Sequence, residues 1–464
     1  MIRLQKNTFP IDRTIKEFAS VFDSAGFSLY VVGGAVRDWL LDIPNDDYDF
    51  TTDAMPDEVI SLFRKVIPTG IKHGTVTVLF KGFQYEVTTF RTDGEYHDHR
   101  HPDRVQFVRS LEEDLKRRDF TINAIAANAF TGAMIDMHDG VQDLGLRIVR
   151  AIGNPFERFS EDALRILRAC RFATKLDFSI EPATYGAMKE LSGTLRNVSD
   201  ERIRDELIKI ISSKKPLRGF ELMKDCGILD LVLPELMAGD GVEQRGFHQH
   251  DVLTHNLLAC QAAADLDAPL EVRIAALLHD IGKPQVRVEN GDGTYTFHRH
   301  ELESEKQARR ILGRLKFSNE ERDGILNLIR NHMFHYTPDW SDGAVRRFIS
   351  RVGMNAIPNL FLLRMADQRA IAGACDPATV QELEERIENI RKEGDALSVK
   401  ELAINGKDLM AMGVPAGPTM GTILNQLLET VMDDPRQNVK DRLELIAGGL
   451  YEKIRSMEPK DRKN

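Results

Sequence analysis

The chain of 464 residues is longer than one hydrophobic core normally supports, so we expect roughly two to four domains. Its 42% hydrophobic and 29% charged residues are typical of a soluble globular protein, and no apolar run approaches the length of a membrane-spanning helix. The net charge of −10 argues against indiscriminate binding to nucleic acid, and no DNA partner is expected, although a local basic groove could still bind one folded RNA. The four cysteines form no C-x-x-C pair and the N-terminus lacks a signal-peptide core, so a cytoplasmic location is expected.

The first predicted element is a helix that ends near residue 26. Ile15, Phe18 and Phe22 recur at helical spacing, and Gly26 closes the segment. The stretch VVGGAVRDWLLDIPNDDYDF, residues 31–50, then predicts a strand, a glycine turn, a short helix and a second strand.

The glycine turn in this stretch is suited to binding phosphate. Gly33 and Gly34 leave the backbone bare, so its N–H groups can approach phosphate oxygens closely. Arg37 follows in the first turn of the helix, where a guanidinium can bind the same phosphates through two hydrogen bonds. A Gly-Gly pair alone is more often an ordinary turn, so the prediction depends on the acids that follow.

Two of these acids alternate along the predicted second strand. Alternate residues of a strand share a face, so Asp47 and Asp49 should point the same way. Carboxylates held this close repel one another unless divalent cations lie between them, which is the arrangement that metal-dependent phosphoryl transfer requires. The alternative is a solvated Asp-rich loop.

A short helix is predicted from Pro56 to Phe63, and a β-hairpin follows it. Residues 70–91 alternate apolar and polar side chains across Gly82. Glu86 on the second strand either completes a metal-binding trio with the two aspartates or pairs with a basic residue at a sheet edge. The polar segment of residues 92–105 cannot bury a strand or helix face, so we expect a mobile loop over the site.

Two helices carry the next groups of polar residues. Residues 111–130 predict one amphipathic helix, and residues 136–150 a turn and hairpin that end the first domain. A second helix is predicted over residues 158–176, whose charged residues would form an exposed acid–base ladder in the absence of a ligand. Amphipathic helices continue from about residue 180 to 240. The polar residues of the two helices are Arg117, Arg118, Asp119, Asn123, Asp162, Arg165, Arg168 and Arg171.

A second candidate site, formed by histidines and aspartates, is predicted after residue 248. His255 lies on one predicted helix, His279 and Asp280 close a second helix, and Asp367 lies on a third. Isolated histidines on apolar helices are usually packed core residues, but the dipeptide HD between LL and IGK predicts a bound divalent metal. Such a metal polarises water for the cleavage of phosphate esters.

Two further histidines, His300 and His332, could add a second metal to this set or could be ordinary core residues. After Cys375 the chain becomes strongly charged, which predicts a helical connector followed by a helical tail.

Taken together, these motifs resemble one known family. GG-x-VRD and D-x-D within residues 33–49, RRD-x-T-x-NA at 117–124, D-x-x-x-G-x-x-DL at 136–144 and ED-x-x-R-x-x-R at 161–168 resemble the class II CCA-adding tRNA nucleotidyltransferases and poly(A) polymerases. The histidine and aspartate set resembles that of HD-domain phosphohydrolases.

The resemblance implies a multidomain α+β chain. We expect a polymerase-β-like nucleotidyltransferase head with a mixed sheet at residues 1–150 and an all-helical neck and body at 151–240. An HD metal-dependent phosphohydrolase domain should follow at 241–375, and a helical tail that binds tRNA at 376–464.

The resemblance also implies a role for each residue. Asp47 and Asp49 would hold Mg²⁺ in the head, with Glu86 as a third acid. Asp162 and Arg165 would read the nucleobase through hydrogen bonds that imitate a base-pair edge. The nucleotide would be bound by Gly33, Gly34, Arg37, Arg118, Asp119, Asn123, Arg168 and Arg171.

The implied reaction is the template-independent addition of C-C-A to the 3′ end of tRNA from CTP and ATP. The HD site could add a phosphatase or phosphodiesterase activity on RNA ends. The alternatives are a poly(A) polymerase or an A-only tRNA nucleotidyltransferase and, from another class, an HD phosphohydrolase whose head only binds nucleotides.

Overall fold

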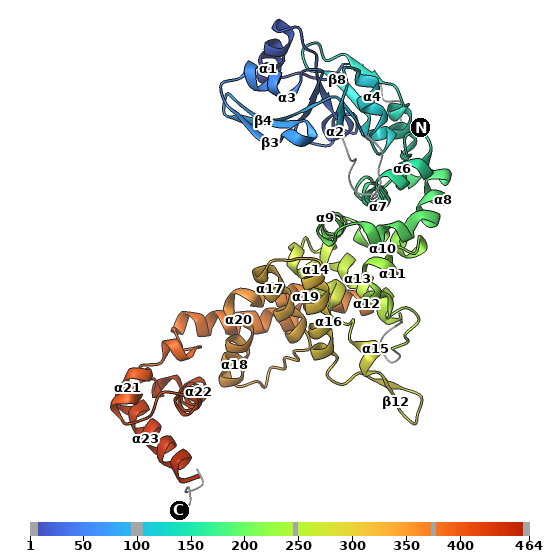
Figure 1. Cartoon of the computed structure of the whole chain (residues 1–464). Coiled ribbons are helices and arrows are strands. Elements are labelled where there is room, and N and C mark those ends of the chain that lie inside the picture. Colours follow the sequence, from blue (N-terminus) through green and yellow to red (C-terminus); the bar gives the residue numbers. More distant parts are fainter. Residues whose placement is uncertain (1–7, 94–104, 245–248, 373–376, 458–464) are drawn as a thin grey trace, which may run out of the picture. The chain divides into compact units, whose positions relative to one another are not determined.

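A computed structural model describes residues 8–93, 105–244, 249–372 and 377–457 (Figure 1). The chain forms two compact units, of which the first contains the residues up to Met237 together with Gly313–Lys316. The second unit contains Ala238–Leu312 and the residues from Phe317 onwards. Among the described residues, no helix combines the length and the apolar character that a membrane crossing requires.

The first unit begins with the predicted mixed sheet, which has seven strands in the order β3-β4-β5-β2-β1-β8-β9. Strand β2 pairs parallel with β5 and antiparallel with β1, so residues from distant parts of the chain meet at its first residue. A separate short ribbon, β6 with β7, flanks the segment outside the described residues, so the mobile loop expected there stays a prediction. The strands are β1 Leu29–Val32, β2 Asp49–Thr52, β3 Val66–Gly70, β4 Thr75–Phe80, β5 Phe83–Thr89, β6 Arg91–Asp93, β7 Val105–Phe107, β8 Ile125–Asn128 and β9 Met134–Asp136.

The predicted first helix and hairpin are both confirmed. Phe18 on the first helix is fully buried in an aromatic cluster, with neighbouring ring centroids 4.8 to 5.4 Å away. The hairpin turn consists of Lys81 and Gly82, both with positive φ, which suits the twist of the flanking strands β4 and β5. The helical segments of the head are α1 Arg13–Ser24, α2 Gly34–Leu40, α3 Pro56–Leu62, η1 Ile71–His73, α4 Leu111–Lys116, η2 Thr121–Asn123 and α5 Gly140–Leu146.

Two predictions for the head are wrong. The helix expected over residues 111–130 ends at Lys116, and Ile125–Asn128 instead forms the interior strand β8 between β1 and β9. The hairpin expected over residues 136–150 contains helix α5, because the Asp136 carboxylate accepts hydrogen bonds from the backbone N–H groups of Gly140 and Val141 at 2.8 Å each. These bonds satisfy donors at the start of the helix that would otherwise lack partners.

The helical neck follows, and one predicted helix is interrupted in it. Asp162 has an extended backbone that separates α6 from α7, and its carboxylate accepts a hydrogen bond from the Leu164 backbone N–H at 3.1 Å. Ile166, Leu167, Cys170 and Ala173 of α7 are fully buried. The elements of the neck are α6 Pro155–Glu161, α7 Leu164–Leu176, α8 Pro182–Leu191, η3 Ser192–Asn197, α9 Asp200–Ile211, α10 Pro216–Asp225, α11 Leu229–Val232 and α12 Pro234–Met237, with the short parallel pair β10 Ile148–Val149 and β11 Ser179–Ile180.

The second unit is almost entirely helical. Helix α13 packs against both α14 and α19, and this packing brings together the segments that carry the predicted metal ligands. Towards the C-terminus, fully buried Ile404, Leu409 and Ile423 belong to a separate apolar core. The helical segments are α13 Val252–Asp265, α14 Leu270–Leu278, α15 Lys283–Val286, α16 His300–Arg314, α17 Asn319–Asn331, α18 Asp342–Val352, η4 Met354–Ala356, α19 Ile357–Ala372, α20 Ala378–Glu393, η5 Val399–Glu401, α21 Gly406–Ala411, α22 Pro418–Asp433, η6 Pro435–Gln437 and α23 Lys440–Met457, and a small ribbon joins β12 Val288–Glu289 to β13 Tyr295–Thr296.

Candidate active site and candidate metal centre

The glycine turn of the head lies against two guanidinium groups. Gly33 has a φ of +71°, in the region where a side chain is strained, and connects β1 to α2. A Cβ atom placed on Gly33 would lie 3.4 Å from Arg118 Nη1, and one placed on Gly34 would lie 3.6 Å from Arg37 Nη2. The bare backbone and both cations therefore share one small region, as a phosphate site requires.

A continuous chain of hydrogen bonds connects this turn to helix α7. The guanidinium of buried Arg37 donates to Asp38 Oδ1 at 2.7 Å and to Asn123 Oδ1 at 2.6 Å. Asn123 donates in turn to Asp119 Oδ1 at 3.0 Å, and Arg168 Nε donates to Asp119 Oδ2 at 2.7 Å. Four of the predicted nucleotide-binding residues therefore belong to one network.

The charges in this network are held in their ionised forms. Burial raises the pKa of Asp119, but the charge of Arg168 and hydrogen bonds from Asn123, Arg168 and the Phe120 backbone together lower it to about 2. Burial lowers the pKa of Arg171 to about 10, although the charge of Glu206, whose Oε2 lies 2.9 Å from Arg171 Nε, acts in the opposite direction. The guanidinium groups of Arg168 and Arg171 are therefore both charged at neutral pH.

Three of the arginines lie around one aromatic ring. The guanidinium carbons of Arg171, Arg37 and Arg168 lie 4.2, 5.2 and 5.6 Å from the centroid of the Phe172 ring. Contacts of this kind with an aromatic face contribute roughly 0.5–2 kcal/mol each. The ring thus holds like-charged groups together, and the sequence analysis did not identify Phe172 as part of the site.

Two of the three predicted acids lie opposite each other on neighbouring strands of the head. Asp49 is the first residue of β2 and lies directly opposite Glu86 of β5, whereas Asp47 lies in the loop before the strand and not on it as predicted. Burial raises the pKa of Asp49, the negative charges of Asp47 and Glu86 raise it further, and the charge of Arg118 lowers it. A carboxylate whose ionised form is opposed in this way gains from a bound cation.

The two residues expected to read the base contact different partners. Asp162 Oδ2 accepts a hydrogen bond from Arg202 Nη2 at 2.8 Å. Arg165 donates to Glu161 Oε2 at 2.5 Å and to the Arg117 carbonyl at 3.0 Å, and it is buried. These two residues of the predicted helix 158–176 therefore do not form the exposed acid–base ladder that the sequence analysis considered as the alternative.

Five further residues contact the site residues without having been predicted. Asp38 lies within a quoted motif, and Asp114 and Phe172 lie a few residues from one, so a residue left unassigned beside a matching motif was the available signal for them. Arg202 and Glu206 lie on α9, outside every quoted motif, and no sequence signal indicated them. These residues are Asp38, Asp114, Phe172, Arg202 and Glu206.

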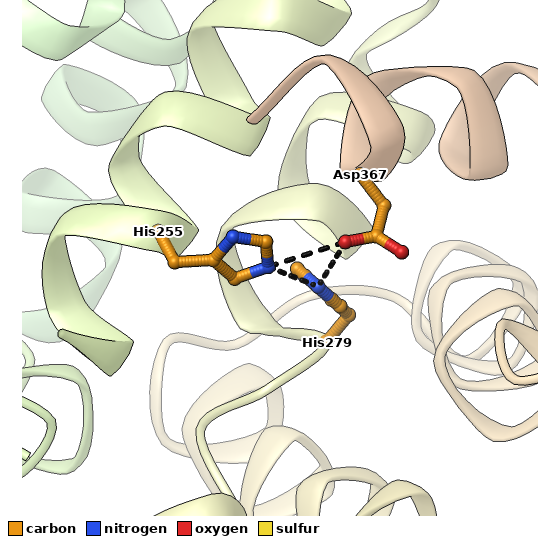
Figure 2. A group of neighbouring side chains, drawn as sticks. All are labelled: His255, His279 and Asp367. Atoms are coloured by element: carbon orange, nitrogen blue, oxygen red, sulfur yellow. Dashed lines mark hydrogen bonds and ion pairs between the residues drawn. The ribbon is translucent and has the colours of Figure 1, made fainter. Parts of the chain in front are cut away.

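The second unit contains a compact cluster of potential metal ligands. His255 lies on α13, His279 at the end of α14 and Asp367 on α19 (Figure 2). His255 Nε2 lies 3.1 Å from His279 Nε2 and 3.2 Å from Asp367 Oδ1. Within the described ranges, sets of three ligand atoms within 4.8 Å of one another occur in this cluster, and the head acids do not meet that spacing.

Asp280 connects this cluster to a second pair of histidines. Its Oδ2 lies 3.3 Å from both His255 Nε2 and His279 Nε2, and its Oδ1 lies 3.1 Å from His300 Nε2. His300 Nε2 is in turn 3.3 Å from His332 Nε2. The six predicted ligands are therefore all brought together, and every one of them is buried.

The ring orientations of three of these histidines suit the binding of a cation. The Nδ1 atoms of His279, His300 and His332 lie 2.8, 2.9 and 2.7 Å from backbone carbonyls, which can only accept, so each Nδ1 carries the proton. In the neutral rings Nε2 then presents a lone pair to the shared centre, as in metal-binding histidines. Burial lowers the pKa of His332, which favours the neutral ring, and the buried Oδ1 of Asp280 makes no hydrogen bond within the described structure.

One basic residue also contacts this centre. Lys283 Nζ lies 2.6 Å from Asp280 Oδ2 and donates to Gln244 Oε1 at 2.6 Å. Burial lowers the pKa of His279, but the charges and hydrogen bonds of Asp280 and Asp367 raise it overall, to about 10. A divalent cation would balance the negative charges of Asp280 and Asp367 in the same way as a protonated His279 does.

The sheet topology, the glycine turn and the acids at the start of β2 define a nucleotidyltransferase head. The family description "Poly A polymerase head domain" matches residues 29–150, one for an RNA-binding site of polymerase A matches 177–239, and one for domain 2 of tRNA nucleotidyltransferases matches 287–447.

Comparison with whole proteins defines the family further. The CCA-adding enzyme of Limosilactobacillus fermentum is 35% identical over 431 residues, which cover 93% of this chain and 95% of that protein. The crystal structure of the Bacillus stearothermophilus CCA-adding enzyme in complex with CTP is 30% identical, with a TM-score of 0.71, and the match covers 97% of this chain and 99% of that one. This chain belongs to the family of CCA-adding enzymes, which are template-independent tRNA nucleotidyltransferases. With the CCA-adding enzyme of Ligilactobacillus salivarius, 49% identical over 220 residues, the match spans about half of each protein, 47% of this chain and 52% of that one.

Proposed function

We propose that the head of this chain binds CTP and ATP in turn and adds C-C-A to the 3′ end of tRNA, releasing pyrophosphate each time. The observation that carries the assignment is the pairing of Asp49 with Glu86 beside Arg118, whose guanidinium lies against Gly33. An acid that would bind a cation then lies next to a turn that would hold a triphosphate. Membership of the family supports the choice of substrates, and the related Bacillus stearothermophilus enzyme was crystallised with CTP.

The head residues fit Mg²⁺, because hard oxygen ligands that repel one another are the set this ion prefers. Asp47, Asp49 and Glu86 would hold it, and the bound ion would activate the attacking hydroxyl and stabilise the leaving pyrophosphate. The protein's own groups supply orientation. Arg37 and Arg118 bind the phosphates, while Asp119 and Asn123 face the sugar.

The remaining assignments concern the base and the neck. Asp162 and Arg165 would read the base edge, and Arg168 and Arg171 would hold the nucleotide from α7. The helical neck and the C-terminal helices would bind the tRNA body. Because tRNA maturation takes place in the cytoplasm, we assign the enzyme to that compartment.

The head assignment is tested by primer extension on tRNA that ends before its C-C-A. CTP alone should add C-C, ATP alone should add nothing, and both together should stop at C-C-A. A long A tail would instead identify a poly(A) polymerase, and growth with ATP alone an A-only enzyme. D47N and D49N should abolish extension while the protein keeps its tRNA affinity in a filter-binding measurement.

The histidine cluster supports a second function, phosphohydrolysis at RNA ends. His255, His279, Asp280 and Asp367 would form one metal site, with His300 and His332 adding a second that shares Asp280. The observation in favour is that the Nε2 atoms of His300 and His332 face each other at 3.3 Å while both Nδ1 atoms lie beside backbone carbonyls, an arrangement that a shared cation would stabilise. A metal bound there would polarise water for attack on a phosphate ester.

This second function is tested on oligonucleotides with 2′,3′-cyclic or 3′-phosphate ends. The wild-type protein should release phosphate or open the cyclic ester, H279A should not, and both should extend tRNA normally. Metal content measured by mass spectrometry should fall in H279A. A wild-type protein that binds no metal and cleaves neither end would contradict the proposal and leave the head function untouched.

A further inference from the structure

Asp114 on α4 is a fully buried carboxylate to which nothing above assigns a role in nucleotide binding. Its Oδ1 accepts hydrogen bonds from Arg117 Nε at 3.0 Å and Nη2 at 2.8 Å, and from the Arg91 backbone N–H at 3.4 Å. Its Oδ2 accepts from Arg118 Nη2 at 3.2 Å and Thr51 Oγ1 at 3.4 Å. One carboxylate therefore contacts β2, β6 and two consecutive arginines.

These contacts have a direct consequence for Arg118. Its Nη2 is held by Asp114, its Nη1 lies 3.4 Å from the Cβ position of Gly33, and its buried Nε makes no hydrogen bond within the described structure. The guanidinium is thus fixed at Nη2, and its Nη1 lies beside the glycine turn.

We propose that Asp114 is a positioning residue for nucleotide binding, which holds the Arg118 guanidinium beside Gly33. The inference depends on the proposed role of Arg118 in binding the triphosphate. A charge-assisted bond to a fully buried carboxylate restricts a long side chain more strongly than an exposed ion pair does. An arginine held in advance loses less conformational freedom when the ligand binds.

The experiment measures CTP binding by calorimetry in EDTA, so that no catalytic step and no metal is involved. D114N keeps the size of the side chain and removes its charge, and we expect about tenfold weaker binding, which corresponds to about 1.4 kcal/mol. R118A should weaken binding at least as much. In the R118A background, D114N should have no further effect, because its action on CTP passes through Arg118.

A matched control separates positioning from loss of structure. Asp143 is also buried in the head, accepts from Thr121 Oγ1 at 2.6 Å and Arg150 Nε at 3.0 Å, and contacts none of the proposed nucleotide-binding residues in these bonds. D143N should lower the thermal unfolding midpoint about as much as D114N does and leave CTP affinity within about twofold of wild type, since only the structural role is lost.

Each result decides between specific alternatives. Equal loss of affinity in D114N and D143N, or an undiminished effect of D114N in the R118A background, overturns the inference. Unchanged CTP affinity in R118A would contradict the proposed role of Arg118 itself. If D114N does not fold, D114E serves as the second variant. It keeps the charge and displaces the carboxylate, so weaker CTP binding is again expected and wild-type binding is the contradicting result.

Discussion

Replacing Asp119 with asparagine removes the central charge of the hydrogen-bond network that connects the head to α7. The pKa of this carboxyl falls from 3.8 to about 2 in the folded protein. Each pKa unit corresponds to about 1.4 kcal/mol, so ionised Asp119 stabilises the fold by about 2 kcal/mol at neutral pH. Breaking a buried ion pair can cost about 3–5 kcal/mol, but the Arg168 side chain is 34% exposed, which places the expected loss for D119N near the lower figure.

The sign of the pH dependence follows from the lowered pKa. Asp119 is ionised in both the folded and the unfolded chain above about pH 5, so its full contribution is present there. As the pH falls from about 4 towards 2, the unfolded chain binds a proton first and the contribution is lost. The difference in unfolding free energy between wild type and D119N should therefore be constant from pH 7 to pH 5 and shrink below about pH 4.

The assay uses one of the two tryptophans of the chain. Trp39 lies on α2 in the first unit and Trp340 in the second, so in a W340F background the fluorescence of Trp39 follows urea unfolding of the first unit alone. The matched control is D177N. Asp177 is 41% exposed beside Lys215, and its positive φ suits asparagine, so D177N should change stability by less than about 1 kcal/mol. Equal stability of D119N and wild type at pH 7, or a difference that does not vary with pH, would refute the reasoning.

Three further substitutions test other parts of the two sites. G33A places a side chain where φ is +71° and 3.4 Å from Arg118 Nη1, so we expect a loss of about 1–3 kcal/mol in urea unfolding and weaker CTP binding by calorimetry. F172L removes the ring shared by three guanidinium groups, and thermal unfolding should show a loss of at least about 1 kcal/mol, whereas unchanged stability would mean that the ring contacts contribute nothing. H332A should reduce the metal content measured by mass spectrometry and leave tRNA extension at the wild-type rate, and slower extension would show that the two sites depend on each other.

Residues that pair within one hairpin were predictable from the sequence. Strict alternation across Gly82 predicted the β4–β5 hairpin, and Glu86 lies opposite Asp49 because β5 also pairs with β2. The clustering of the four potential ligands His255, His279, Asp280 and Asp367 was also predictable, because the HD dipeptide at a helix end is a recognisable pattern and two other helices complete the set. In both cases a local pattern and one long-range contact were enough.

Residues whose partners come from distant elements were not predictable. The segment IAAN at 125–128 has the composition of a helix, yet it forms an interior strand because β1 offers a pairing edge and all of Ile125, Ala126 and Ala127 are fully buried there. Tertiary pairing outweighs helix propensity in such a short apolar run. Similarly, nothing in the spacing of Asp162 indicated that Arg202, on another helix, would be its partner.

The pairing of the arginines explains how a chain with a net charge of −10 can hold a triphosphate. Arg37, Arg168 and Arg171 each lie beside one acid, namely Asp38, Asp119 and Glu206. A guanidinium has five N–H donors, and a single carboxylate uses at most part of them, so the remaining donors can orient phosphate oxygens. These acids already balance the charges of the three arginines. The three arginines therefore neutralise little of the negative charge of a triphosphate. We expect the rest of that charge to be balanced by Arg118, which shares the single carboxylate of Asp114 with Arg117, and by cations at the proposed ligands Asp47, Asp49 and Glu86. Nucleotide binding should therefore be tighter with Mg²⁺ than in EDTA.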